Sequence, residues 1–497
     1  MEIKWRNSNY LPYYYKINKY RKVLESKIEK IKKTSIFEEK LSLAEDAANY
    51  ATYFPTGYYA SSEIEEVFLE AAKQLPKVEC TPEKKTILHV LTQAYTTGGH
   101  SRVVERWINS SPADEKHSVI LLNQADVEWF LWLKKAANNH NGEFVVLEPA
   151  DILTRAYKLR QLASQYEKII LHTHMEDGTA IIAFGLPSFT NPVILFNHAD
   201  HLFWLGVSIA DVVADIRHNN ISAIYRGASV RARFLGIPPE AVSDNLLSMK
   251  KNSKTSIREM LNIPQDAFMI VSTASAHKYS RFGRLHISRL LSSINRKHQN
   301  VYTYLIGPSM QDDDEWKRVY DQSEQRVIPL GNISDKVLYY KYLLSADLYI
   351  GSFPTGSFTA MMDGVQMGLP CIQLALIKQE DSTSALDTKE KESLCWCYSE
   401  HEFIYRVGEA INDQVFYQRL LNDSQRWLKE YADTQGWSER KNHIYELATN
   451  HRVHPFKERV VLNDMFVQNL FFVSGNRDFS NNLFRRLAHM WLYWRIK

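Results

Sequence analysis

Short apolar segments alternate with helical segments along most of this 497-residue chain. Ten of them have the length and composition of buried strands: TILHVLTQAY, HSVILLN, EFVVLE, KIILHTH, PVILFNH, FMIVSTAS, VYTYLIG, RVIPLG, DLYIG and PCIQL. A strand followed by a helix, repeated, is the pattern of a parallel sheet covered by helices. We therefore predict two doubly wound α/β domains, residues 83–250 and 257–440, whose ligands bind at the carboxyl ends of the strands.

Three further regions flank or join these domains. Residues 1–82 carry apolar residues three or four positions apart, as in YRKVLESKIEKIKK and SEIEEVFLEAAKQL, which predicts a small helical N-terminal extension. The polar stretch 243–256 has the composition of a linker, and residues 441–497 are expected to be mainly helical. Residues 1–33 hold ten Lys or Arg, and FSNNLFRRLAHMWLYWRIK, residues 479–497, holds four more among aromatic side chains. Such segments can contact an anionic membrane surface, although packing of the last one onto the protein body is the favoured interpretation.

The composition is that of a globular protein that does not cross a membrane. The chain is 45% hydrophobic and 24% charged, and its formal net charge of +3 gives no indication of a nucleic-acid partner. Its sequence has no uncharged apolar stretch of about 18 residues and no apolar signal-peptide core. The four cysteines lack the spacing of a zinc site and are expected to be reduced thiols. We expect a cytoplasmic protein, with peripheral membrane contact as the alternative.

The segment ADLYIGSFPTGSFTAMMDGVQMGLPCIQL, residues 346–374, predicts a strand, a loop, a helix and another strand. Gly356, Ser357 and Thr359 lie where the helix should begin, and free backbone N–H groups there can bind an anion. Asp363 follows one turn later and can accept hydrogen bonds from ribose hydroxyls. An ordinary capped helix is the alternative for this segment.

This segment resembles the donor site of the cytoplasmic N-glycosyltransferases that modify bacterial adhesins, which are relatives of the O-GlcNAc transferases. The shared residues, at the same spacing, are Phe353, Pro354, Gly356, Asp363, Gly368, Leu369 and Pro370. The resemblance implies a GT-B fold, with two Rossmann-like domains facing a cleft. It also implies that Ser357, Phe358 and Thr359 bind the diphosphate of a UDP-sugar and that Asp363 binds its ribose.

A second similarity lies in ASAHKYSRFGRL, residues 274–285, directly after the first strand of the second domain. Lys278 occupies the position of a family lysine that neutralises the donor pyrophosphate, and His277 and Arg281 could assist it. An ammonium group there stabilises the charge that builds up on departing UDP, so no metal cofactor is expected. The acidic run QDDDEW, residues 311–316, is expected to cap a helix and not to bind Mg²⁺.

The first domain carries candidate catalytic residues in PVILFNHADHLFWLG, residues 192–206, where a predicted strand ends. His198 best matches a histidine that lies near the acceptor and the leaving group in the same family. Histidine suits proton transfer near neutral pH, and Asp200 or a backbone group could orient the ring. His201 is a second candidate. In the alternative interpretation these histidines only make hydrogen bonds in a polar loop.

The loop AYTTGGHSRVVERW, residues 94–107, resembles the Gly-Gly loop of many two-domain glycosyltransferases, including the large retaining family 4. Gly98 and Gly99 would allow close approach of the backbone to the donor, and a plain tight turn is the alternative. The loop lacks the G-x-G-x-x-G pattern, which disfavours a dinucleotide cofactor. The retaining enzymes carry Glu-x7-Glu in their donor motif, whereas this chain has Thr355 and Asp363 at those positions, which favours inversion.

We therefore predict a glycosyltransferase that moves a hexose or an N-acetylhexosamine from a UDP-sugar to a protein or glycan acceptor, without a metal and with inversion. The adhesin-modifying enzymes have a much larger helical N-terminal domain than this chain. The acceptor can therefore be a cell-surface glycan instead of a protein. Three alternatives stay open: a retaining glycosyltransferase of polysaccharide synthesis, a sugar-nucleotide 2-epimerase, and a non-catalytic partner subunit of another transferase. A degenerate subunit should bind no UDP-sugar.

Overall fold

The computed structural model describes residues 11–95, 99–124, 131–218, 221–228, 231–240, 254–281, 286–375 and 394–460. These residues form two compact units. Unit 1 contains the described residues up to 240 together with 425–460, and unit 2 contains 254–375 with 394–424. The long helix α16 (Gln414–Ala432) begins in unit 2 and ends in unit 1.

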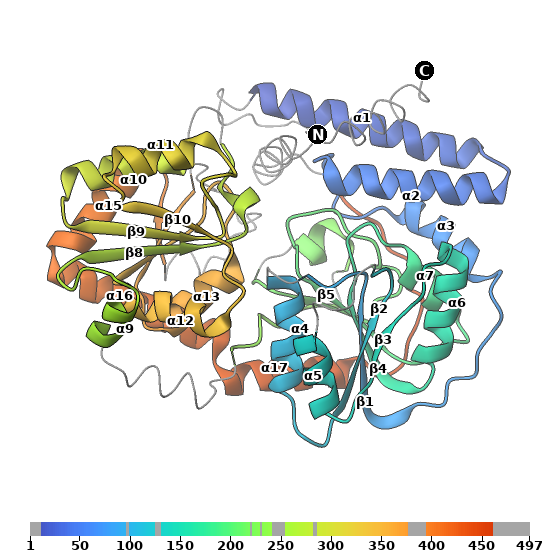
Figure 1. Ribbon diagram of the computed structural model, residues 1–497. Helices are drawn as coiled ribbons and strands as arrows, with labels where there is room; N and C mark the ends of the chain where they lie inside the picture. Colours follow the sequence, from blue (N-terminus) through green and yellow to red (C-terminus); the bar gives the residue numbers. More distant parts are fainter. Residues whose placement is uncertain are drawn as a thin grey trace. The chain divides into compact units, whose positions relative to one another are not determined.

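Unit 1 is built on a seven-stranded sheet with the order β3-β2-β1-β4-β5-β6-β7 (Figure 1). Every neighbouring pair is parallel. Its strands are β1 (Glu83–Leu91), β2 (Lys116–Leu121), β3 (Phe144–Val146), β4 (Tyr166–His172), β5 (Val193–Asn197), β6 (Val212–Asp215) and β7 (Ala232–Phe234). Its helices beside the sheet are α4 (Gly99–Asn109), α5 (Leu131–Asn139), α6 (Ile152–Ala163), α7 (Thr179–Phe184), the short π-helix Ile221–Tyr225 and α17 (Thr434–Leu447).

The N-terminal extension consists of three helices, α1 (Leu11–Lys33), α2 (Phe37–Tyr53) and α3 (Ser62–Ala72), and belongs to unit 1. The helices α1 and α2 lie side by side in Figure 1, and Leu24 of α1 and Leu41 of α2 are buried in one core. The side chain of Phe68 on α3 packs on Gly178, where an added Cβ would lie 2.5 Å from the ring. The extension is therefore an integral part of the core of unit 1.

Unit 2 is built on a six-stranded parallel sheet with the order β10-β9-β8-β11-β12-β13. Its strands are β8 (Phe268–Thr273), β9 (Val301–Ile306), β10 (Val327–Gly331), β11 (Leu348–Ile350), β12 (Cys371–Leu374) and β13 (Cys395–Cys397). Its helices are α9 (Lys254–Met260), the short 3-10 helix Ala276–Tyr279, α10 (Ile287–Lys297), α11 (Asp314–Gln322), α12 (Lys336–Ser345), α13 (Phe358–Gln366) and α15 (Glu400–Asn412).

The predicted fold class, two doubly wound parallel sheets with a helical N-terminal extension, is confirmed, and all ten predicted strands are present. The strands β6, β7 and β13 were not predicted. The predicted linker 243–256 is partly helical, since α9 begins at Lys254. Within the described part of the chain, no helix is both long and apolar enough to cross a membrane.

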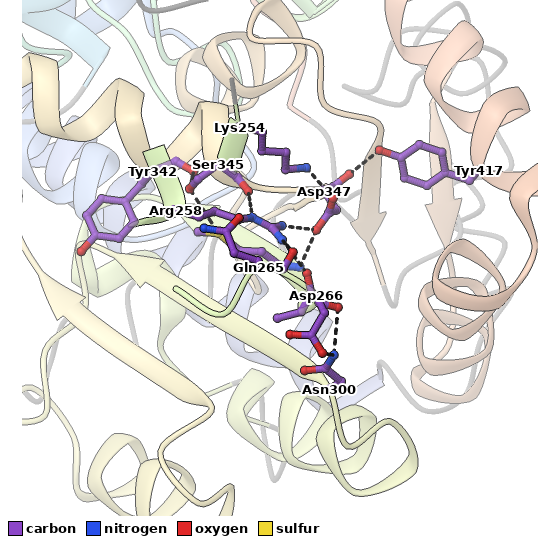
Figure 2. Close-up of polar contacts among 11 residues, drawn as sticks. Lys254, Arg258, Gln265, Asp266, Asn300, Tyr342, Ser345, Asp347 and Tyr417 are labelled. Atoms are coloured by element: carbon purple, nitrogen blue, oxygen red, sulfur yellow. Dashed lines mark hydrogen bonds and ion pairs between the residues drawn. The ribbon is translucent and has the colours of Figure 1, made fainter. Parts of the chain in front are cut away.

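Figure 2 shows how α9 is fixed to the sheet of unit 2. Asp347, directly before β11, accepts hydrogen bonds from the Arg258 guanidinium at 2.7 Å, from the Met269 N–H at 2.7 Å and from the Lys254 ammonium. The Tyr417 hydroxyl donates to the Asp347 carbonyl at 2.9 Å. These contacts lie at the amino ends of the strands, whereas ligands of such sheets bind at the carboxyl ends, so we assign this cluster a structural role.

Candidate functional site

The turn before α13 meets the loop after β8 at the carboxyl edge of unit 2. The Lys278 Nζ donates to the Gly356 carbonyl at 3.2 Å, and the Thr355 N–H donates to the Lys278 carbonyl at 3.4 Å. These two motifs are far apart in sequence, and both were predicted to bind the donor diphosphate. The structure therefore brings the predicted lysine to the predicted helix start.

The start of α13 leaves room for a ligand. Gly356 is exposed, and a Cβ added to it would meet no atom within 4 Å. Ser357 precedes the helix without a capping hydrogen bond from its side chain, and Phe358 and Thr359 in the first turn are half-buried. The first N–H groups of a helix have no partner within the helix, so an anion can bind there.

Asp363 lies one turn further along α13 and is only 5% exposed. The Tyr339 hydroxyl, from α12, donates to its Oδ2 at 3.2 Å and orients the carboxylate. The next residue, Gly364, packs so closely on the Tyr349 ring of β11 that an added Cβ would lie 2.5 Å away. The helix is thus seated on the sheet, with its carboxylate at a fixed position.

The other two predicted donor-binding side chains near Lys278 have different surroundings. Burial, with a smaller effect from the Lys278 charge, lowers the pKa of His277 to about 4, so this ring is neutral at pH 7. Arg281 forms an ion pair with Glu315 at 3.2 Å, at the start of α11. Lys278 therefore bonds to the turn before α13, whereas Arg281 bonds to α11.

The acidic run at 311–316 caps a helix, as predicted. Asp313 is the N-cap residue of α11 and accepts from the Glu315 N–H at 2.9 Å. Asp312 accepts from the Ser309 N–H at 2.6 Å and from the Ser309 hydroxyl at 2.8 Å. These carboxylates close the turn that leads into the helix.

His198 lies at the carboxyl edge of unit 1, directly after β5, and is half-buried. Its ring centroid is 4.2 Å from that of His100 and 4.7 Å from that of Trp204. Burial, followed by the nearby histidines, holds the pKa of His198 well below its usual value. The ring is therefore neutral at pH 7 and able to accept a hydrogen bond.

Asp200 is buried beside the other predicted histidine of this loop. Its Oδ1 lies 3.6 Å from His201 Nδ1, and its Oδ2 lies 3.9 Å from Arg217 Nε. Burial opposes ionisation of Asp200, but the charges of Arg217, His201 and Arg226 outweigh it and lower the pKa to about 2. Asp200 is thus an ionised carboxylate that pairs with His201.

Further polar side chains at this edge were not predicted as site residues. His100 follows Gly99, the first residue of α4, and His174 follows β4. The Tyr95 hydroxyl bonds to His174 Nε2 at 2.8 Å. The signal was available, because each histidine lies within a few residues of a predicted strand end or of the Gly-Gly loop. Gly98 lies outside the described residues.

Although several histidines gather here, their arrangement is not that of a metal centre. Among the described residues, no group of three or more His, Cys, Asp or Glu side chains could hold a metal ion. The His100 Nε2 bonds to the His172 carbonyl at 2.8 Å, and other ring nitrogens bond to one another. The imidazoles thus form hydrogen bonds with their neighbours instead.

The comparisons with known proteins identify the fold. No protein-family model and no curated protein matches the sequence. Among solved structures, the chain is similar to HepE of Anabaena in complex with UDP-glucose, with 16% identity, a TM-score of 0.53, and 72% of this chain and 99% of that chain covered. It is also similar to a glycosyltransferase from Rickettsia africae, with 10% identity, a TM-score of 0.54, and 73% and 99% coverage. The two parallel-sheet units have the GT-B fold of glycosyltransferases.

Proposed function

We propose that this protein is a glycosyltransferase that moves a sugar from a UDP-sugar to an acceptor, without a metal and with inversion. Unit 2 binds the donor and unit 1 binds the acceptor. The acceptor is a glycan or a protein, and the sugar is a hexose or an N-acetylhexosamine. The donor motif resembles that of the adhesin-modifying N-glycosyltransferases.

One observation carries this proposal: the hydrogen bond from Lys278 Nζ to the Gly356 carbonyl at the start of α13. An ammonium group beside the first N–H groups of a helix can bind a diphosphate. As the bond to the sugar breaks, negative charge grows on the departing UDP, and Lys278 stabilises it there. Asp363, oriented by Tyr339, accepts from the ribose hydroxyls.

A solved structure with the same fold supports a UDP-linked donor. HepE has the same fold and was solved in complex with UDP-glucose. In unit 1, His198 and His100 are neutral imidazoles that can accept a hydrogen bond from the hydroxyl or amide of an acceptor. Asp200, two residues after His198, pairs with His201 and with Arg217.

A UDP-release assay tests the proposal. The purified protein is incubated with a panel of UDP-sugars and EDTA, alongside Lys278→Ala and Asp363→Ala. We expect release of UDP from one donor, insensitive to EDTA, with a loss of at least about 100-fold in Lys278→Ala. Lys297→Ala, which removes an exposed lysine of α10, is the control and should retain full activity.

Two results would contradict the proposal. Turnover that needs a divalent metal would refute the metal-independent mechanism. Absence of turnover, together with absence of a thermal shift for every nucleotide sugar, would favour a non-catalytic partner subunit.

A further inference from the structure

Three buried histidines form a diagonal row across the sheet of unit 1. In the strand register, His117 of β2 lies opposite Ile87 of β1, and His172 of β4 lies opposite Leu91. His89 lies midway on β1, two residues after Ile87 and two residues before Leu91. Alternate residues of a strand point to the same face, so the three rings share one face of the sheet. The row runs from the amino end of β2 to the last residue of β4.

Hydrogen bonds join these rings to one another and to a carboxylate. Glu115, directly before β2, lies 3.3 Å from His117 Nε2. The His117 Nδ1 lies 2.9 Å from His89 Nε2, and the His89 Nδ1 lies 3.1 Å from His172 Nε2. All three histidines have 0% exposure. The row therefore has a carboxylate at one end and the carboxyl edge of the sheet at the other.

The carboxylate determines where every ring hydrogen lies. An ionised Glu115 can only accept a hydrogen bond, so His117 Nε2 carries a hydrogen. In the neutral ring His117 Nδ1 is then bare, which means that it carries no hydrogen and can accept. His117 Nδ1 therefore accepts from the Nε2–H group of His89, and His89 Nδ1 accepts from the Nε2–H group of His172. His172 Nδ1 is then left without a hydrogen. Burial, and to a smaller extent the charges of neighbouring ionisable groups, holds the pKa of His89 and of His172 well below the usual value. These rings therefore stay neutral.

At the carboxyl edge, the row meets a fourth histidine. The His100 Nε2 donates to the His172 carbonyl at 2.8 Å, so His100 Nδ1 is also bare. Both bare Nδ1 atoms are buried, and neither has a hydrogen-bond partner among the described residues. Two acceptors cannot bond to each other, so each remains able to accept from another group.

We propose that Glu115 is a positioning residue for the acceptor edge of unit 1. Through His117 and His89 it fixes His172 as the tautomer with a bare Nδ1. His172, the last residue of β4, therefore presents an acceptor nitrogen and not an N–H group on the sheet face, while its carbonyl accepts from His100. The effect of this arrangement on an acceptor substrate, and only this effect, rests on the proposed glycosyltransferase function.

Lys441 of α17 is the group that would reverse the row. Its Nζ donates to Glu115 Oε2 at 3.0 Å, and it is 1% exposed at the side chain. An ammonium group can only donate, so without Glu115 it would become a donor beside His117 Nε2. Each ring would then exchange its donor and acceptor nitrogens, and His172 Nδ1 would become an N–H group.

Nitrogen NMR of the histidine rings tests this directly, because it distinguishes the two neutral tautomers. We expect the Nε2–H tautomer at His89, His117, His172 and His100 in the wild-type protein. Glu115→Ala should convert the first three to Nδ1–H, whereas Glu115→Gln keeps an acceptor oxygen and should retain the wild-type pattern. Asp114→Ala removes the adjacent exposed carboxylate and serves as the control. Nδ1–H tautomers in the wild type, or an unchanged pattern in Glu115→Ala, would overturn the proposal.

Kinetics test the link to catalysis. In Glu115→Ala, kcat should fall about 10-fold to 100-fold, less than the ~10⁴-fold loss known for a catalytic histidine in the wrong tautomer, because Glu115 acts through other rings. The KM for the UDP-sugar should not change, and Glu115→Gln should restore most of kcat. Reversed tautomers with unchanged kcat would refute the positioning role. If the wild type transfers no sugar, the proposed function fails, while the NMR result still decides the structure of the row.

Discussion

The carboxyl edges of the two sheets use opposite electrostatic arrangements. In unit 2, a lysine that keeps part of its surface exposed bonds to the start of a helix, next to an exposed glycine. In unit 1, the imidazoles of His100 on α4 and His198 after β5 are packed together, and burial keeps them neutral. The first arrangement suits a diphosphate anion, and the second suits an uncharged hydroxyl or amide. The predictions below test this contrast, from the largest expected effect to the smallest.

Acid should destabilise unit 1 more than unit 2. Six histidines of unit 1 have a pKa lowered from 6.5 in the folded state: His89, His100, His117, His172, His174 and His198. Above pH 6.5 these histidines are neutral in the folded and in the unfolded protein, so they do not lower the free energy of unfolding. Below pH 6.5 the unfolded state binds more protons, so each histidine lowers the free energy of unfolding by about 1.4 kcal/mol per pH unit.

Hydrogen exchange between pH 7 and pH 5, corrected for its intrinsic pH dependence, measures this in each unit separately. Burial raises the pKa of four carboxylates of unit 1, which oppose the trend but are fewer: Glu65 to about 7, Asp215 to about 6, and also Glu45 and Glu176. We expect protection in β1, β4 and β5 to fall more steeply than in β8 and β9. Equal loss in the two units would show that the buried histidines do not set the acid stability of unit 1.

Two glycines of unit 2 should respond in opposite ways. Gly356→Val should leave the melting temperature unchanged, because a Cβ there meets no atom within 4 Å, but it should weaken UDP binding at least about 10-fold by filling the space at the start of α13. Gly364→Ala should cost about 1–3 kcal/mol of stability, because its Cβ would overlap the Tyr349 ring. Calorimetry with UDP and thermal unfolding measure both. Normal UDP binding by Gly356→Val would place the donor elsewhere.

The N-terminal extension should support the histidine edge of unit 1. Glu65 of α3 accepts from the N–H groups of Gly206, Val207 and Ser208 at 2.8, 3.1 and 2.8 Å, in the loop that also carries His198. In Glu65→Gln, one acceptor oxygen becomes an NH₂ group that faces these donors, which should cost about 1–3 kcal/mol. Chemical denaturation checks this, with the exposed neighbour Glu66→Gln as the control. Equal stability of the two variants would contradict the role of Glu65.

The smallest effect is expected at Tyr339. Tyr339→Phe removes the hydrogen bond to Asp363 without removing the ring, so affinity for the UDP-sugar should fall about 2-fold to 10-fold. Tyr405→Phe, at an exposed tyrosine, is the control. A titration of the UDP-sugar measures the change. Unchanged affinity would mean that the Asp363 carboxylate needs no support from α12.

The sequence could predict features that depend on short segments. Each apolar run predicted its strand, and the spacing around Gly356 and Asp363 predicted the start of α13. The meeting of Lys278 with Gly356 followed from a family resemblance. The histidine row could not be predicted, because it depends on strand order and register, which place His117, His89 and His172 on adjacent strands. The contact of Arg281 with α11 also depends on tertiary packing.

The most direct test of the central claim is the binding of UDP in the presence of EDTA, measured by calorimetry for the wild type and for Lys278→Ala. If the ammonium group and the start of α13 bind the diphosphate, the wild type binds UDP without metal. Lys278→Ala should then lose about 2–3 kcal/mol, or roughly 30-fold to 150-fold in affinity. Equal affinity in the two proteins, or binding by the wild type only when a divalent metal is added, would contradict the account.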